Sequence, residues 1–237
     1  MATISGHTIK AFDEDLDRLR ALISQMGGLA EHAIRESMRC LVQRDVDGAQ
    51  KIFENDKKLD ALELETERRA IQLIALRAPM ADDLRDVVAA MKISSVVERI
   101  GDYAKNIAKR VPMIAADGGS HRIEPLSLLP SMARMASDMV RAALDAFAAR
   151  DAEAAIRVVE SDAALDDFYD SIFRTLVTSM VENPRTISQV AHLLFVAKNL
   201  ERVGDHATNV AEMVYFAATG TQMADRDRDG STFEDRV

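Results

Sequence analysis

The sequence predicts an all-α fold of two tandem, pseudo-symmetric three-helix bundles. Long segments carry apolar residues at steps of three and four, which is the period of an amphipathic helix. No segment shows the alternation of apolar and polar residues, bounded by turn residues, that marks a half-buried strand. Features of the first half also recur, in the same order, in the second half.

Six helices follow from the apolar periodicity and from the residues that interrupt it. Asp45 and Asp151 are typical N-caps, because each precedes a new helical pattern. Pro79 and Pro184 are expected in the first turn of a helix, where proline is tolerated. The expected helices are 9–44, 46–77, 80–115, 126–150, 152–182 and 185–218.

One break in the helical pattern separates two domains. It contains Gly118, Gly119 and Pro125, and glycine and proline interrupt regular structure. The predicted organisation is a first bundle over 8–115, a linker over 116–125, a second bundle over 126–219 and a flexible tail over 220–237.

The clearest internal repeat is the pentapeptide Glu-Arg-(Ile/Val)-Gly-Asp, which begins at Glu98 and again at Glu201. Each copy is followed four residues later by an asparagine, Asn106 or Asn209. Further upstream, the Asp-X-X-X-Asp motif of Asp56 and Asp60 matches that of Asp162 and Asp166. The acidic residues of the two halves form a first acidic cluster (Asp56, Asp60, Glu98 and Asp102) and a second acidic cluster (Asp162, Asp166, Glu201 and Asp205).

Spacing along the chain predicts that the four carboxylates of each cluster meet. Asp60 and Glu98 are each 19 residues from Pro79, and Asp56 and Asp102 are each 23 residues from it. A hairpin that turns at this proline therefore places both acid pairs at the same level on adjacent antiparallel helices. The second half has nearly the same spacing about its own proline.

Two interpretations of the clusters remain open. Salt bridges within a helix would offset the repulsion in the first half, where Lys105 follows Asp102 by three residues. The equivalent position in the second half is Thr208, so we expect nothing there to offset the repulsion. Bound metal is the other interpretation. Oxygen ligands favour iron, manganese, magnesium or calcium over zinc.

Composition and charge exclude several classes of protein. A net charge of −9 and a pI near 5.1 argue against binding to nucleic acid or to anionic membrane surfaces. No apolar run is long enough to insert into a bilayer, and the N-terminus lacks the pattern of a secretory signal. The single cysteine, Cys40, is expected in the core. We therefore expect a cytoplasmic protein.

Enzymatic motifs are also missing from the sequence. There is no Glu-X-X-His pair of a di-iron oxidase and no Gly-rich elbow that carries a nucleophile. We expect no catalytic residues. The alternative to a metal-binding protein is a metal-free helical interaction scaffold with salt-bridged acidic faces.

The doubled Glu-Arg-X-Gly-Asp motif, with its asparagines and upstream acid pairs, resembles the PhoU family of phosphate-uptake regulators. The resemblance covers roughly residues 8–218. It implies a cytoplasmic protein, expected to form a homodimer, that negatively regulates the phosphate-starvation response. Its implied partners are the phosphate transporter ATPase and a sensor histidine kinase.

The resemblance also implies metal ligands and their order of importance. The implied metal is iron, with zinc, manganese or magnesium as alternatives. Position by position, the ligands are first Glu98, Asp102, Glu201 and Asp205, then Asp56, Asp60, Asp162 and Asp166, and last Asn106 and Asn209. Lys105 and Lys109 depart from an all-acidic stripe in the first half.

Overall fold

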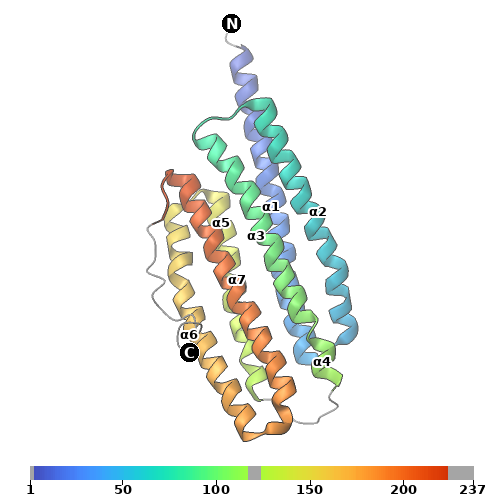
Figure 1. Ribbon diagram of the computed structural model, residues 1–237. Helices are drawn as coiled ribbons and strands as arrows, with labels where there is room; N and C mark the ends of the chain where they lie inside the picture. Colours follow the sequence, from blue (N-terminus) through green and yellow to red (C-terminus); the bar gives the residue numbers. More distant parts are fainter. Residues whose placement is uncertain (1–2, 117–123, 224–237) are drawn as a thin grey trace.

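The computed structural model describes residues 3–116 and 124–223, which form helices and no strand (Figure 1). In chain order the elements are α1 (Thr3–Gln43), α2 (Val46–Arg77), α3 (Asp82–Ala108), α4 (Val111–Ala116), the 3-10 turn η1 (Glu124–Ser127), α5 (Leu129–Ala149), α6 (Ala152–Glu182), the 3-10 turn η2 (Pro184–Thr186) and α7 (Ile187–Thr219). The predicted all-α class is confirmed. None of the described helices is long and apolar enough to cross a membrane.

The long helices form two three-helix bundles that lie side by side. Helices α1, α2 and α3 pack on one another, and so do α5, α6 and α7. Contacts between α3 and α7 and between α1 and α5 join the two bundles (Figure 1). Helices α2 and α6 therefore lie on the outer sides of the molecule, each beside the helix that carries a pentapeptide.

The predicted N-caps are confirmed at the first turn of each bundle. The backbone N–H of Gly48 donates to Asp45 Oδ1 at 2.8 Å, and that of Ala154 donates to Asp151 Oδ1 at 2.9 Å. The arginine before each cap has a left-handed backbone, with φ of 54° and 52°. This conformation ends one helix, so that the next can begin in the opposite direction.

The second turn of the first bundle differs from the prediction. Pro79 was expected in the first turn of a helix, but it lies in the connection before α3, which begins at Asp82. The proline ring disfavours the right-handed helical conformation for the preceding residue. Ala78 has a φ of 45° instead, and α2 ends at Arg77. The corresponding Pro184 does begin a helical turn, η2.

The helix predicted over 80–115 is interrupted near its end. Helix α3 stops at Ala108, and α4 begins at Val111 after a turn. Pro112 explains the break, because its ring would clash with the carbonyl of Ala108 in a continuous helix.

Two predicted segments lie mostly outside the described residues. These are the linker over 116–125 and the tail over 220–237, of which residues 117–123 and 224–237 are not described. The helix predicted from 126 begins at Leu129, after η1.

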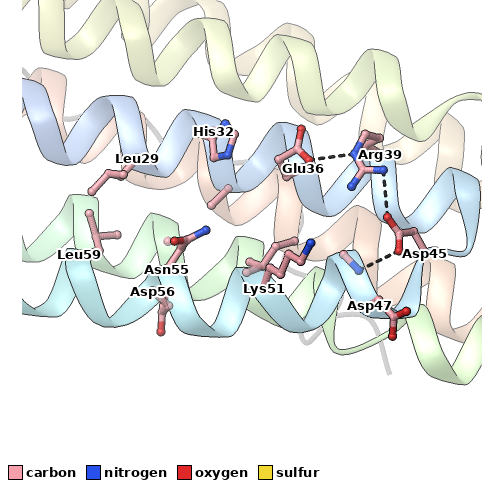
Figure 2. Close-up of a pocket in the computed structure, with 14 residues that line it drawn as sticks. Leu29, His32, Glu36, Arg39, Asp45, Asp47, Lys51, Asn55, Asp56 and Leu59 are labelled. Carbon is pink, nitrogen blue, oxygen red and sulfur yellow. Dashed lines mark hydrogen bonds and ion pairs between the residues drawn. The ribbon is translucent and has the colours of Figure 1, made fainter.

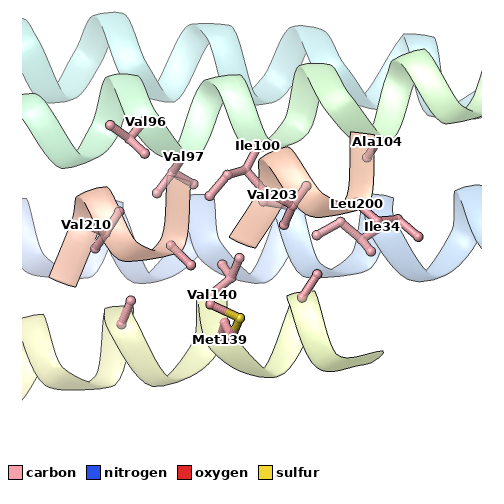
Figure 3. Close-up of a cluster of buried hydrophobic side chains, with 14 of the residues drawn as sticks. Ile34, Val96, Val97, Ile100, Ala104, Met139, Val140, Leu200, Val203 and Val210 are labelled. Carbon is pink, nitrogen blue, oxygen red and sulfur yellow. The ribbon is translucent and has the colours of Figure 1, made fainter. Parts of the chain in front are cut away.

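Both bundles contribute to one continuous hydrophobic core (Figure 3). Between α3 and α7, side chains of the two repeats interleave, with α1 behind them and α5 below α7 in this view. The labelled residues of the first bundle are Ile34, Val96, Val97, Ile100 and Ala104, and those of the second are Met139, Val140, Leu200, Val203 and Val210. The apolar faces of α3 and α7 are therefore shared between the bundles.

A buried carboxylate also connects the two bundles. The side chain of Asp86 on α3 is only 5% exposed and lies between two arginines. Its Oδ2 accepts from Arg20 Nη2 of α1 at 3.2 Å, and its Oδ1 is 3.1 Å from Arg150 Nη2 at the end of α5. Burial raises the pKa of Asp86, while the two guanidinium groups act in the opposite direction.

Candidate functional site

The glycine of each pentapeptide is the point at which two helices touch. A Cβ atom at Gly101 would overlap Leu59 Cδ2 of α2, and one at Gly204 would overlap Leu165 Cδ2 of α6. Both leucines are buried. The missing side chain therefore lets α2 approach α3, and α6 approach α7. Sequence analysis missed this role, although the glycine recurs in both repeats.

This close approach brings acidic residues of α2 and α3 together. Asp56 lies one turn before Leu59, and its side chain is only 8% exposed. Lys105 Nζ contacts Asp56 Oδ2, and it lies 2.5 Å from Asp102 Oδ1. Asp56 and Asp102 thus meet at one level, as their spacing from Pro79 predicts. The salt bridge expected between Asp102 and Lys105 is present and extends to a second helix.

Glu98 is half-buried, like Asp56 and Asp102 of the first acidic cluster. Burial, followed by the negative charges of Asp102 and Glu63 and then those of Asp60 and Asp56, raises the pKa of Glu98 from 4.5 to about 7. Glu63, which sequence analysis did not include, lies at i+3 from Asp60 on α2. At neutral pH this cluster therefore carries less negative charge than four carboxylates would.

The second acidic cluster is partly neutralised from a direction that sequence analysis did not consider. Lys198 Nζ lies 2.6 Å from Glu201 Oε1. The expectation that no cation offsets this cluster was therefore wrong. Thr208, the counterpart of Lys105, lies downstream of Asp205, whereas Lys198 lies three residues upstream of Glu201. This i, i+3 spacing was the signal available in the sequence.

Glu201 is the most enclosed acid of the pentapeptide in the second half, with a side chain 13% exposed. Burial raises its pKa, Asp205 and Asp166 add to the effect, and Lys198 opposes it. Glu201 Oε2 is buried and receives no hydrogen bond from the described residues. Asp162 is half-buried and its Oδ1 is directed toward α7 near Gly204, whereas Asp166 and Asp205 are exposed.

The two asparagines have partners on their own helices. Asn106 Oδ1 accepts from Lys109 Nζ at 3.0 Å, and Asn209 Nδ2 lies 3.2 Å from His206 Nδ1. Across residues 3–116 and 124–223, no three His, Cys, Asp or Glu side chains are close enough together to hold a metal ion. The ligand assignments made from the sequence stay predictions.

A pocket of about 310 Å³ lies between α1 and α2, next to the contact that α2 makes with α3 (Figure 2). Arg39 is paired inside the first bundle with Glu36 at 2.9 Å and with Asp45 at 3.0 Å. Asp56 and Gly101 form the end of the pocket next to the first acidic cluster. Cys40 beside it is fully buried, and burial raises the pKa of its thiol. Three of the four acids that line the pocket are therefore paired, Glu36 and Asp45 with Arg39 and Asp56 with Lys105.

Comparison with known proteins gives the same family for both halves of the chain. A model of the PhoU domain matches residues 23–111 and 129–214. A protein of Zymomonas mobilis, named phosphate-specific transport system accessory protein PhoU homolog, is 56% identical over 223 residues, which cover 94% of this chain and 93% of the relative. A Rhizobium meliloti protein of the same name is 44% identical and covers 96% of this chain and 95% of the relative.

Solved structures agree with the sequence relatives. The crystal structure of PhoU from Pseudomonas aeruginosa superposes with a TM-score of 0.83 at 35% identity, and covers 89% of this chain and 100% of that one. A phosphate transport system regulatory protein PhoU from Streptococcus pneumoniae shares the fold, with a TM-score of 0.81 at 24% identity, over 90% of this chain and 99% of that one. The matched domains, the relatives and the fold together show that this chain belongs to the PhoU family.

Proposed function

We propose that this protein is an accessory protein of a phosphate-specific transport system, which acts in the cytoplasm as a negative regulator of the phosphate-starvation response. The observation that carries the proposal is the nearly full-length match, at 56% identity, to a relative named as an accessory protein of a phosphate-specific transport system. The two matched PhoU domains cover the helices of both bundles.

The protein acts by binding and not by catalysis. We propose that it is an adaptor, in homodimeric form, between the transporter ATPase and a phosphate-sensing histidine kinase. Support comes from the shared core, which holds both bundles in one body, and from the two acidic clusters on its outer sides. Such a body would present an acidic face of each bundle to a different partner.

The metal part of the proposal fits the two clusters unequally. In the second half, Glu201 Oε2 is buried without a hydrogen bond from the described residues. This is expected of an oxygen atom that binds a metal ion. Glu201, Asp205, Asp162 and Asp166 would hold the ion there once their side chains draw together, because no three of them lie close enough to hold it as they are arranged. Iron is the first choice, with zinc, manganese or magnesium as alternatives. A bound ion would supply positive charge between α6 and α7. In the first half, Lys105 already lies between Asp56 and Asp102, and these residues do not fit an ion as they are arranged.

The second candidate function is a metal-free scaffold with salt-bridged acidic faces. The lysine in each cluster favours it, since ammonium groups offset part of the repulsion. Elemental analysis of protein purified without chelators separates the two. Bound iron that is lost in E201Q/D205N supports the metalloprotein, and a metal-free wild type supports the scaffold.

The regulatory role is tested in a strain that lacks the gene. We expect a phosphate-responsive reporter to be active at high phosphate in this strain and repressed again by the wild-type gene. Unchanged reporter expression would contradict the proposal.

A further inference from the structure

We propose that the Lys105 ammonium group is the resident counter-ion of the first acidic cluster and excludes metal ions from it. The inference deepens the metal part of the proposed function and concerns the half of the molecule that does not need an ion from solution.

The position of Lys105 is that of a bridging cation. Its side chain extends from α3, is 23% exposed, and reaches one carboxylate on its own helix and one on α2. The α2 partner, Asp56, is 8% exposed, so water does little to screen this contact. A metal ion would have to displace an ammonium group that is tethered to the chain and therefore always present.

The equivalent position in the second half has no such group. Thr208 replaces Lys105, and its hydroxyl donates to the backbone carbonyl of Asp205 at 2.6 Å. It is turned toward its own helix and brings no charge to the second acidic cluster. The two repeats therefore differ at the position from which Lys105 bridges both helices in the first half.

The lysine of the second half is placed differently. Lys198 lies on α7 itself and pairs with Glu201 of the same helix, with 45% of its side chain exposed. Its ammonium group is 5.4 Å from the ring centroid of Tyr169. Lys198 is more exposed than Lys105, 45% against 23%, so its ammonium group is more readily displaced from its carboxylate. On α6 it lies over the ring of Tyr169, whereas Lys105 contacts a carboxylate on α2.

The difference predicts how the two halves depend on metal. The contact between α2 and α3 has its bridging cation in the chain itself and should be independent of the metal supply. The contact between α6 and α7 has no lysine at the position of Lys105 and should respond to a cation from solution. Two copies of one repeat would thus have diverged into a metal-independent half and a metal-responsive half.

The test measures Mn²⁺ binding by equilibrium dialysis and thermal unfolding in EDTA. In wild type, E98Q/D102N should leave the amount of bound Mn²⁺ unchanged. Lys105→Thr, which introduces the residue of the second half, should bind about one additional Mn²⁺ per chain. Its affinity at the first cluster should rise about tenfold or more, because a like charge beside the ligands is removed. Its melting temperature should fall in EDTA and recover when Mn²⁺ is added.

Two further variants control for folding and for net charge. Lys105→Gln keeps most of the side-chain stem and should also gain Mn²⁺, which covers the case in which the threonine variant does not fold. Lys109→Thr removes the same charge from an exposed lysine that pairs with Asn106, and it should gain none.

The outcomes are separable from those of the proposed function. If both Lys105 variants bind no more Mn²⁺ than wild type, or if E98Q/D102N removes Mn²⁺ from the wild type, Lys105 does not exclude metal and the inference fails. If wild type binds no metal but Lys105→Thr gains an ion, the inference holds while the metal part of the proposed function fails.

Discussion

Tyr103 and His206 occupy equivalent positions in the two repeats and stack on each other where α3 meets α7. Their ring centroids are 5.3 Å apart with an interplanar angle of 21°, and Tyr103 Oη is 3.1 Å from His206 Nε2. Burial, together with the positive charges of Arg99 and Arg202, lowers the pKa of His206, so its ring is neutral at pH 7. Equivalent residues of the two repeats are thus in contact with each other at the centre of the molecule.

This contact should couple the two bundles measurably. Tyr103→Ala and His206→Ala are each expected to lower the free energy of unfolding. The double variant should lose about 1 kcal/mol less than the sum, because the aromatic pair is then removed only once. Urea unfolding at pH 7.5 measures the cycle. Additive effects would show that the stacked rings do not stabilise one another.

The pentapeptide glycines are expected to be intolerant of a single methyl group. Gly101→Ala and Gly204→Ala should each destabilise the protein by about 1–3 kcal/mol, because a Cβ overlaps a buried leucine of the neighbouring helix. Gly28→Ala is the matched control, since that helical glycine has no atom within 4 Å of its Cβ position. It should stabilise by about 0.5–1 kcal/mol. Chemical denaturation measures the free energy of unfolding of all three variants. Equal effects in the three would refute the packing role of Gly101 and Gly204.

The buried carboxylate between the bundles is expected to be a strong determinant of stability. Asp86→Ala leaves two arginines without their shared partner and should cost about 3 kcal/mol. Asp82→Ala removes a largely exposed acid that pairs with Arg85, and should cost less than about 1 kcal/mol. A comparably small loss in both variants, measured by urea unfolding, would mean that Asp86 does not hold the bundles together.

The raised pKa of Glu98 predicts how the metal-free protein responds to pH. The unfolded chain releases this proton near 4.5, but the folded protein keeps it until about 7. Within that window the folded state binds more protons, so the contribution of Glu98 to stability decreases as pH rises from 4.5 to 7 and is constant above. Glu98→Gln should therefore flatten the pH dependence in EDTA and be more stable than wild type at pH 8.

The check is a series of urea titrations from pH 4.5 to 8. Glu67→Gln, an exposed change on α2, should give a curve parallel to that of the wild type. A glutamine variant at 98 that follows the wild-type curve would contradict the predicted pKa.

The fold was predictable from the sequence because its signals are local or repeated. Helical periodicity and capping by Asp45 and Asp151 depend on neighbouring residues, and the hairpin register follows from counting residues on both sides of a turn. The break after Ala108 was missed because apolar periodicity continues through Pro112. Here the proline interrupts the helix even though the apolar residues around it keep the helical period.

The side-chain contacts of the candidate site were less predictable. Spacing placed Asp56 level with Asp102, but whether Lys105 reaches one helix or two depends on how close the helices lie. That distance is set by Leu59 against Gly101, a contact between residues far apart in the chain. In the second half, the positive charge comes from Lys198, which lies upstream of its partner Glu201 and not downstream of Asp205. Which carboxylates a long lysine side chain contacts is decided by the packing of the helices and not by its neighbours in the sequence.

The core that both bundles share has a consequence for the order in which the chain acquires its structure during synthesis. When the ribosome has released the residues up to α4, the apolar face of α3, with Val97 and Ile100, still lacks the helix that covers it, because α7 is made last. The nascent first half therefore exposes apolar surface during the time needed to translate about a hundred further residues. Completion of α7 closes both halves at once, and a chain released before that point would be a natural substrate for chaperones and proteases.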